Sequence, residues 1–311
     1  MKKIHTTAIN RKLNEGRTQF IEDCEQAYCS QIKAAAESIF GYGDERPLIL
    51  LSGPSGAGKT TTALKLSEYL DEMGICTHTV SMDDYFLPAE QNPRALDENG
   101  KIDFESPHRL DIDLLNEHMM KIANCEEVIL PDFNFKEQRR YEGTHLKRKH
   151  GDLVVFEGIH ALNPEITGVT DGFANCIYVS VRTRVQTQSG GVMHPSHIRL
   201  MRRIIRDKLY RARKAEDTIG MFASVERGEN LYIMPYKQRA QYNIDTFIPY
   251  EFSVYKHFLQ SDFQELAQSY SDFGKFELME QALNELEEIE ISYVPSKSLV
   301  REFIGGSGYK Y

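Results

Sequence analysis

One stretch of eight residues constrains the fold of this chain more than any other feature of its sequence. Residues 53–60 read Gly-Pro-Ser-Gly-Ala-Gly-Lys-Thr, a complete GxxxxGK[ST] phosphate-binding loop. An apolar run at residues 48–51 precedes the loop, and a helix with one apolar face is predicted after it, ending at Gly74. Because this loop works between a strand and a helix, the context favours a nucleotide site over an ordinary glycine-rich turn.

Each part of the loop has a chemical role. The glycines let backbone N–H groups converge on phosphates at the start of the helix. Lys59 can reach the β and γ oxygens of a nucleotide, and the Thr60 hydroxyl can bind Mg²⁺. We therefore expect ATP and Mg²⁺ as cofactors. The expected nucleotide-binding residues in this stretch are Gly53, Ser55, Gly56, Ala57, Gly58, Lys59, Thr60 and Thr61.

The rest of the chain alternates short apolar runs with helical patterns. This alternation predicts an α/β fold, the three-layer architecture of P-loop NTPases, in which helices flank a mostly parallel sheet. A leading helix is expected over residues 17–40, a hairpin outside the core over 134–151, and a helical, acidic tail beyond Phe258. The expected strands are residues 48–51, 76–82, 128–130, 153–156, 177–181 and 246–248.

Composition narrows the class of protein. The 311 residues carry 37 Lys and Arg against 46 Asp and Glu, and the net charge of -9 disfavours general binding to nucleic acid or to anionic membranes. Apolar runs are too short to span a membrane, and the amino terminus lacks a secretory pattern, so a cytoplasmic location is expected. Five cysteines without CxxC spacing indicate structural thiols rather than disulfides or a zinc site. The sequence leaves the oligomeric state open and is compatible with a homo-oligomer.

Two carboxylates follow strands at the edge where phosphates should bind. Asp83 and Asp84 come directly after the strand at residues 76–82, and Glu157 ends the strand before Gly158. Carboxyl ends of parallel strands face one crevice, so Asp83 could accept the proton of an attacking hydroxyl. For Asp84 alone, a helix cap or a solvated turn is a better interpretation than a catalytic role. Glu157 is predicted to hold Mg²⁺ or its waters, and an ordinary strand-end charge is the alternative.

An arginine-rich segment at residues 199–213 is the third candidate feature. One face of its predicted helix packs and the other is cationic, which suits the charge that develops on transferring phosphate. A solvated basic face and an RNA-binding helix are the alternatives. The cationic arc, about 100° wide, contains Arg199, Arg202, Arg203, Arg206 and Arg213, and the adjoining apolar face contains Ile198, Met201, Ile205 and Leu209.

Together these residues resemble the uridine kinase and phosphoribulokinase family of P-loop kinases. The resemblance runs from about Leu48 to Tyr255 and includes the phosphate loop, residues 81–86, residues 155–159 and the arginine segment. It is closest to the kinase half of long bacterial uridine kinases, which share the pattern of residues 301–307 (Arg-Glu-Phe-Ile-Gly-Gly-Ser). We expect their threonyl-tRNA-synthetase-like front half to be absent here.

The resemblance implies a role for several residues. Asp83 would be the base, with Lys59 and Arg206 also catalytic, and Thr60 and Glu157 would lie at the metal. Arg203 would lie near the sugar of a nucleoside. Further substrate contacts are expected from Phe133 and Arg140, and Arg211 and Arg213 are expected on a lid over the nucleotide phosphates.

The expected activity is ATP-dependent phosphorylation of the 5′-hydroxyl of a nucleoside, uridine or cytidine first. The partner is therefore a small-molecule nucleoside. A sugar-phosphate or other small-alcohol kinase is the first alternative, because His108 and Arg109 replace acidic and neutral family positions. The second is an ATP-binding regulator without kinase activity. The expected division is a helical extension over residues 1–45, a P-loop kinase domain over 46–258 and a helical extension over 259–311.

Overall fold

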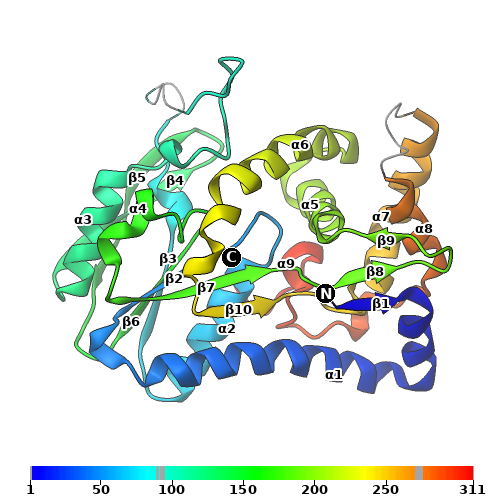
Figure 1. The fold of residues 1–311 in the computed structure, drawn as a ribbon, viewed down its shortest axis with the longest axis horizontal. Helices are drawn as coiled ribbons and strands as arrows, with labels where there is room; N and C mark the ends of the chain where they lie inside the picture. The colour runs from blue at the N-terminus through cyan, green and yellow to red at the C-terminus, as the bar shows by residue number, and fades with distance from the viewer. Residues whose placement is uncertain (1, 89–90, 92–94, 270–275, 311) are drawn as a thin grey trace.

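A central five-stranded sheet organises the protein (Figure 1). The computed structural model describes residues 2–88, 91, 95–269 and 276–310. All neighbouring strands of this sheet are parallel, which confirms the predicted α/β class. Their order across the sheet is β10 (Tyr242–Asp245), β7 (Ala174–Ser180), β2 (Leu48–Ser52), β6 (Leu153–Glu157) and β3 (Thr77–Ser81).

The central strands are short apolar runs because both of their faces are covered. Every residue of β2 and β6 is buried, the pattern of parallel strands between two helical layers. Leu48 and Leu50 of β2 belong to one apolar core, and Ile49 and Leu51 belong to another on the opposite face. The two cores give the three layers that the alternating pattern predicts.

The helices divide between the two faces of this sheet. α1 (Thr6–Phe40), α2 (Lys59–Glu72), α5 (Pro195–Arg211) and α7 (Glu251–Ser269) contribute to the larger core, and α3 (Ile112–Ala123) contributes to the smaller one. The other helices are α4 (Pro164–Thr167), α6 (Ala215–Tyr232), α8 (Glu277–Glu285) and α9 (Arg301–Ile304). The remaining strands are β4 (Glu127–Asn134), β5 (Arg139–Lys147), β1 (Lys3–His5), β8 (Arg184–Gln186) and β9 (Val192–Met193).

Several predicted boundaries are wrong. The last strand is β10, and residues 246–248 follow it as a loop that packs its apolar side chains into the core. Residues 128–130 lie in the antiparallel hairpin of β4 and β5, outside the parallel sheet. α1 begins at Thr6, eleven residues before the expected start at residue 17, and continues through Gly16, where the backbone is locally extended. Periodicity did not reveal these boundaries because burial of an apolar run does not specify its conformation.

The arginine helix α5 also differs from its predicted pattern. Arg199 and Arg202 are buried in ion pairs rather than lying on an open cationic face, and Arg213 lies beyond the end of the helix. Leu209, expected on the packed face, is 46% exposed. Helical spacing grouped these side chains correctly by direction but did not show that carboxylates from other elements cover the first two arginines.

Arg202 joins four parts of the chain inside the core. Its Nε lies 2.8 Å from Glu251 Oε2 of α7, and its Nη2 donates to Glu251 Oε1 at 3.0 Å and to the Thr246 carbonyl at 2.7 Å. Its Nη1 donates to the carbonyl of Gly56 in the phosphate loop at 3.1 Å. The guanidinium also lies 5.1 Å from the ring centroid of Phe303 in α9. All its polar atoms are therefore used.

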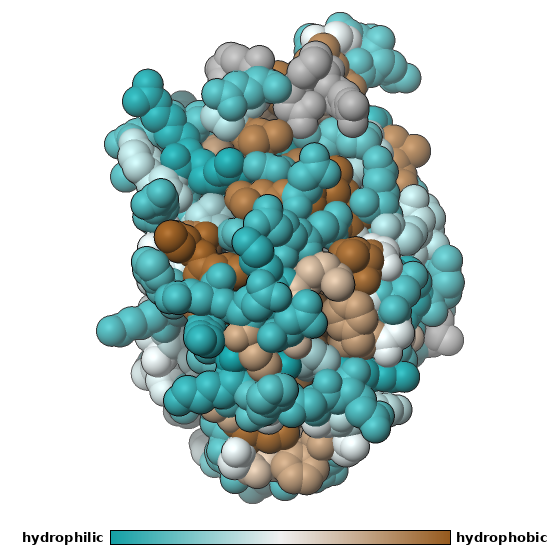
Figure 2. All heavy atoms as spheres, turned by 90° about the vertical axis from the view of Figure 1, so that its left-hand side faces the viewer, coloured by the Kyte–Doolittle hydropathy of each residue, from teal (hydrophilic) through white to brown (hydrophobic). Residues whose placement is uncertain are grey.

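The face of the molecule drawn in Figure 2 is mainly polar. Figure 2 shows that hydrophilic side chains dominate one face, with apolar side chains in separate patches. None of the helices in the described ranges combines the length and apolar character needed to cross a membrane.

Arg202→Met should lower the free energy of unfolding by about 3–5 kcal/mol, because it leaves Glu251 buried without its partner charge. Lys208→Met is the control, since Lys208 is 47% exposed and pairs with Asp262 at 2.8 Å. That substitution should cost less than about 1 kcal/mol. Urea denaturation measures both values. Equal, small losses in the two variants would show that the buried pair does not hold these elements together.

Candidate active site

The phosphate loop connects β2 to α2 at the centre of the sheet. Gly58 precedes α2 with a φ of 82°, a left-handed conformation that favours glycine. At Gly53 a Cβ atom would lie 2.1 Å from the carbonyl oxygen of Val179, so no other residue fits without moving β7. These two glycines allow the loop to pass beside β7 and to turn into α2. The N–H groups in the first turn of α2 favour anions.

Thr60 and Glu157, the two residues expected at the metal, meet beside this loop. The Thr60 hydroxyl donates to Glu157 Oε1 at 3.3 Å. Strand register explains the meeting, because Glu157 pairs with Leu51 of β2 on one side and with Ser81 of β3 on the other. A hydroxyl and a carboxylate are oxygen donors of the type that Mg²⁺ prefers, with phosphates and water completing its ligands. The pair fits such an ion.

Burial dominates the ionisation of Glu157. Burial first, and then the nearby charges of Asp83 and Glu302, raise the carboxyl pKa from 4.5 to about 7. Lys59 and the Thr60 hydroxyl act in the opposite direction. A buried carboxylate with so little compensation is a group that a cation would stabilise.

Asp83 lies at the same edge of the sheet, in the short turn that follows β3. Its side chain is exposed, while nearby protein groups restrict its hydration. This loss of hydration raises the pKa of its carboxyl group against the lowering effect of four cations. Those cations are Lys59, Arg206, Arg211 and Arg109, so the structure places Asp83 among the phosphate loop, α5 and the segment before α3.

Phe133 and Arg140 both have partners within the protein. Phe133 is buried and packs edge-on against Phe86, with ring centroids 5.9 Å apart. Arg140 forms an ion pair with Asp111 at 2.7 Å. Burial raises the pKa of Asp84 to about 6, against the lowering effect of the Phe133 backbone N–H. Contact of Phe133 or Arg140 with a substrate stays a prediction.

Arg199 and Arg203 reach the phosphate loop from α5. Both contact Ser55: Arg199 donates to its carbonyl at 3.2 Å, and Arg203 donates to its hydroxyl. Burial lowers the pKa of Arg203 to about 10. The predicted contact of Arg203 with a sugar is thus untested, and its observed partner is the loop itself.

A buried carboxylate that the sequence analysis did not assign gathers Arg206 and the two arginines expected on the lid, Arg211 and Arg213. Asp207 accepts from Arg206 Nε at 3.4 Å and pairs with Arg211 Nη1 at 3.2 Å and Arg213 Nη1 at 3.9 Å. One negative charge thus holds three positive ones at the end of α5. Their excess charge is available to an anion in the crevice.

Arg109 and Glu105 also lie near Asp83, and the sequence analysis did not predict that these residues belong to one site. Arg109 is buried between Phe86 and Phe104, with its guanidinium 4.9 Å and 5.0 Å from their ring centroids. Glu105 has a raised pKa because it is buried, although Arg203 and Lys59 lower it. His160 is also buried, and burial lowers its pKa to about 3, which keeps it neutral. No common spacing along the chain connects these residues.

The C-terminal segment also reaches the phosphate loop. Glu302 of α9 accepts hydrogen bonds from both the backbone N–H and the hydroxyl of Thr61. Leu299 lies so close to Gly58 that a Cβ atom there would be 2.4 Å from its Cδ1. A separation of 241 residues hides this contact from any local sequence pattern.

One cluster of potential metal ligands lies elsewhere. Cys76, His78 and Asp152 place ligand atoms within 4.8 Å of one another at the amino-terminal ends of β3 and β6. Because the phosphate loop and Asp83 lie at the carboxyl ends of the strands, this cluster is separate from the candidate active site.

Known proteins share the segment that contains these residues. The sequence profile of the "Phosphoribulokinase / Uridine kinase family" matches residues 48–250. A uridine kinase from Clostridium botulinum (strain Kyoto / Type A2) is 26% identical over 199 residues, which are 63% of this chain and 86% of that protein. A uridine kinase from Lactobacillus johnsonii is 28% identical over 198 residues, 63% of this chain and 85% of that protein.

The comparison with solved structures gives matches at lower identity. D-glycerate 3-kinase from Cryptococcus neoformans var. grubii is 13% identical and aligns with 70% of this chain and 87% of its own, with a TM-score of 0.42.

The pKa of Glu157 predicts how stability changes with pH. Since folding raises this pKa from 4.5 to about 7, the protonated side chain favours the folded state at low pH. This contribution is complete below pH 4.5 and is lost as the pH rises through 7. The Glu157→Gln side chain is neutral at every pH, so the stability of this variant should not show this loss. Between pH 4.5 and 8, the free energy of unfolding of the wild type should therefore fall by about 3 kcal/mol relative to that of the variant.

Urea denaturation without nucleotide or divalent cations measures this difference. Glu15→Gln, which removes an exposed carboxylate, is the control and should show almost no relative gain. A constant difference between the wild type and Glu157→Gln across this pH range would refute the assigned pKa.

Proposed function

The chain belongs to the phosphoribulokinase / uridine kinase family, and we propose that it transfers the γ-phosphoryl group of ATP to the 5′-hydroxyl of a nucleoside, uridine or cytidine first. Support for a nucleoside comes from the relatives named uridine kinase, which align over most of their own length. Family membership supports the transfer from ATP, and the nucleoside acceptor is our proposal.

The position of Asp83 is the observation that supports this proposal most strongly. Its carboxylate lies at the carboxyl edge of the sheet, where the charges of Lys59 and Arg206 act on it. In the proposed reaction Asp83 accepts the proton of the acceptor hydroxyl as that oxygen attacks the γ-phosphorus of ATP. The bond from phosphorus to the β–γ bridging oxygen breaks, which yields ADP and the phosphorylated acceptor.

The cations around the loop would stabilise the phosphate oxygens during transfer. Lys59 carries its charge at the first residue of α2, and Arg206 and Arg211 provide two more at the end of α5. A fixed positive environment stabilises developing negative charge without reorganisation during the reaction. Bound Mg²⁺ would neutralise charge on the β and γ oxygens, and Thr60 and Glu157 would hold it.

An anionic small alcohol, such as a sugar phosphate, is the second candidate acceptor. Arg109 supports it, because the guanidinium lies near enough to Asp83 to lower its pKa and keeps its Nε buried without a hydrogen-bond partner. An acceptor phosphate could bind this cation while its hydroxyl meets Asp83. His108 contributes less, since it lies beside Glu165 at 3.6 Å.

A coupled assay of ADP formation with purified protein, Mg²⁺ and ATP tests the acceptor. The panel should contain uridine, cytidine, adenosine, several sugar phosphates and glycerate. We expect turnover with uridine or cytidine well above the background without acceptor. Turnover with a sugar phosphate alone would favour the second candidate. ATP binding without ADP formation on any acceptor would favour a nucleotide-binding regulator.

Asp83→Asn should reduce kcat by at least about 100-fold on the active acceptor, because the amide keeps the shape but cannot accept the proton. Its Kd for ATP should change little. Asp84→Asn is the matched control, since the neighbouring carboxylate lies in the same turn, and it should keep most of its turnover. Steady-state kinetics with equilibrium ATP binding separates the two effects. Comparable kcat values for Asp83→Asn and wild type would exclude Asp83 as the base.

A further inference from the structure

The last part of the chain crosses the start of α2. We call residues 294–309 the C-terminal strap. Its residue Glu302 places Oε2 at 2.6 Å from Thr61 Oγ1 and at 3.2 Å from the Thr61 backbone nitrogen. A carboxylate therefore accepts two hydrogen bonds from a residue of the phosphate-binding segment.

Thr61 is the third residue of α2, so its N–H belongs to the first helical turn. N–H groups there have no partner within the helix and, together with the helix dipole, bind anions. In a phosphate loop these donors serve the α and β phosphates of a nucleotide. Glu302 thus presents to Thr61 the same type of charge that ATP would present. Both anions cannot use these two donors at the same time.

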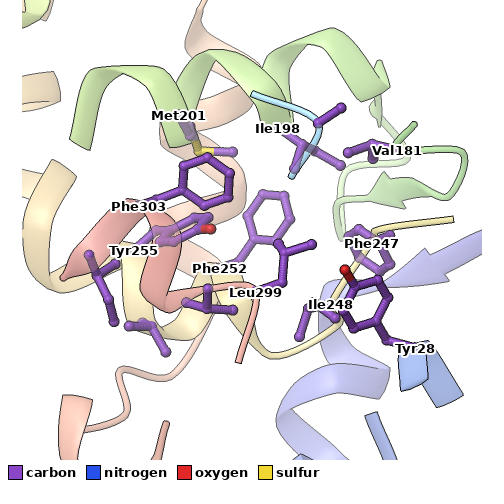
Figure 3. Packing of buried hydrophobic residues seen from close by; sticks show 14 of the residues in the cluster. Tyr28, Val181, Ile198, Met201, Phe247, Ile248, Phe252, Tyr255, Leu299 and Phe303 are labelled. Carbon is purple, nitrogen blue, oxygen red and sulfur yellow. The ribbon is translucent and has the colours of Figure 1, made fainter. Parts of the chain in front are cut away.

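The backbone of the strap is firmly held. Leu299, Val300 and Phe303 are fully buried, and Figure 3 shows Leu299 and Phe303 among apolar side chains of α5 and α7. Arg301 fixes the curve of the strap, because its guanidinium donates to the carbonyls of Ile291, Val294 and Gly305. The strap is built into the core and cannot leave as a whole without exposing apolar surface.

The strap is anchored to α2 at a second point. Lys297 Nζ and the Tyr309 hydroxyl each lie 2.6 Å from an oxygen of Glu68. Glu302, in contrast, is only half-buried. Rotation of the Glu302 side chain, with the strap backbone in place, is therefore the simplest way to free Thr61.

We propose that Glu302 is an internal competitor of the nucleotide, whose carboxylate occupies the position of an ATP phosphate until ATP displaces it. The competitor role adds to the proposed function and depends on one part of it, namely that the phosphate loop binds ATP. Glu302 sets the affinity for ligands that carry phosphates and leaves the affinity for phosphate-free ligands unchanged. The contact thereby couples the C-terminal strap to occupancy of the active site.

Equilibrium binding by calorimetry, without acceptor, tests this role in the full chain. Glu302→Gln keeps the shape of the side chain and removes its charge. We expect its Kd values for ATP and for inorganic tripolyphosphate to fall by about tenfold or more, since removal of one nearby negative charge favours both. Binding of adenosine should not change. Glu302→Ala removes the competing acceptor altogether and should bind ATP at least as tightly as Glu302→Gln.

Glu72→Gln is the matched control, because it removes the same charge at the far end of α2, about 16 Å along the helix from Thr61. Its Kd for ATP should equal that of the wild type. Unchanged or weaker ATP binding by folded Glu302→Gln and Glu302→Ala, judged by an unchanged melting temperature, would overturn the competitor role alone. Failure of every form to bind either polyphosphate would overturn both this role and the proposed function. Binding that persists without acceptor turnover would refute only the proposed acceptor.

Discussion

The buried guanidinium of Arg202 is the interaction on which the rest of this structure depends. It satisfies both oxygens of Glu251 and the carbonyls of Gly56 and Thr246, and it lies against the ring of Phe303. Through Arg202, the helices α5, α7 and α9 together hold the phosphate loop in place. A charge buried this deeply is tolerated only when all its donors are used, so the interaction specifies the relative positions of these elements.

The candidate active site contains both positively and negatively charged side chains. Lys59 and the arginines of α5 face the carboxylates of Asp83, Glu157 and Glu302. Burial of Glu157 and the loss of hydration around Asp83 make the charged forms of both carboxyl groups costly, and their pKa values rise accordingly. Such a site is suited to receive a polyanion with its cation, because each would find its counterpart already in place.

Much of this arrangement could be predicted from local sequence. The phosphate loop, the strand before it and the helix after it are contiguous, and Asp83 and Glu157 each end an apolar run that parallel pairing brings to one edge. Contacts between distant segments could not be predicted in this way. Helical spacing placed Arg199 and Arg202 on one arc but did not reveal Glu229 and Glu251 as their partners. Likewise, the chain shows no spacing that connects Glu302 to Thr61.

The central claim is that residues 53–61 hold the triphosphate of ATP at the edge of the sheet that carries Asp83. A crystal structure with Mg²⁺ and a non-hydrolysable ATP analogue tests it most directly. We expect the triphosphate on the loop, the γ-phosphate facing Asp83, and the Glu302 carboxylate turned away from Thr61. An analogue bound elsewhere, with Glu302 still hydrogen-bonded to Thr61, would contradict it.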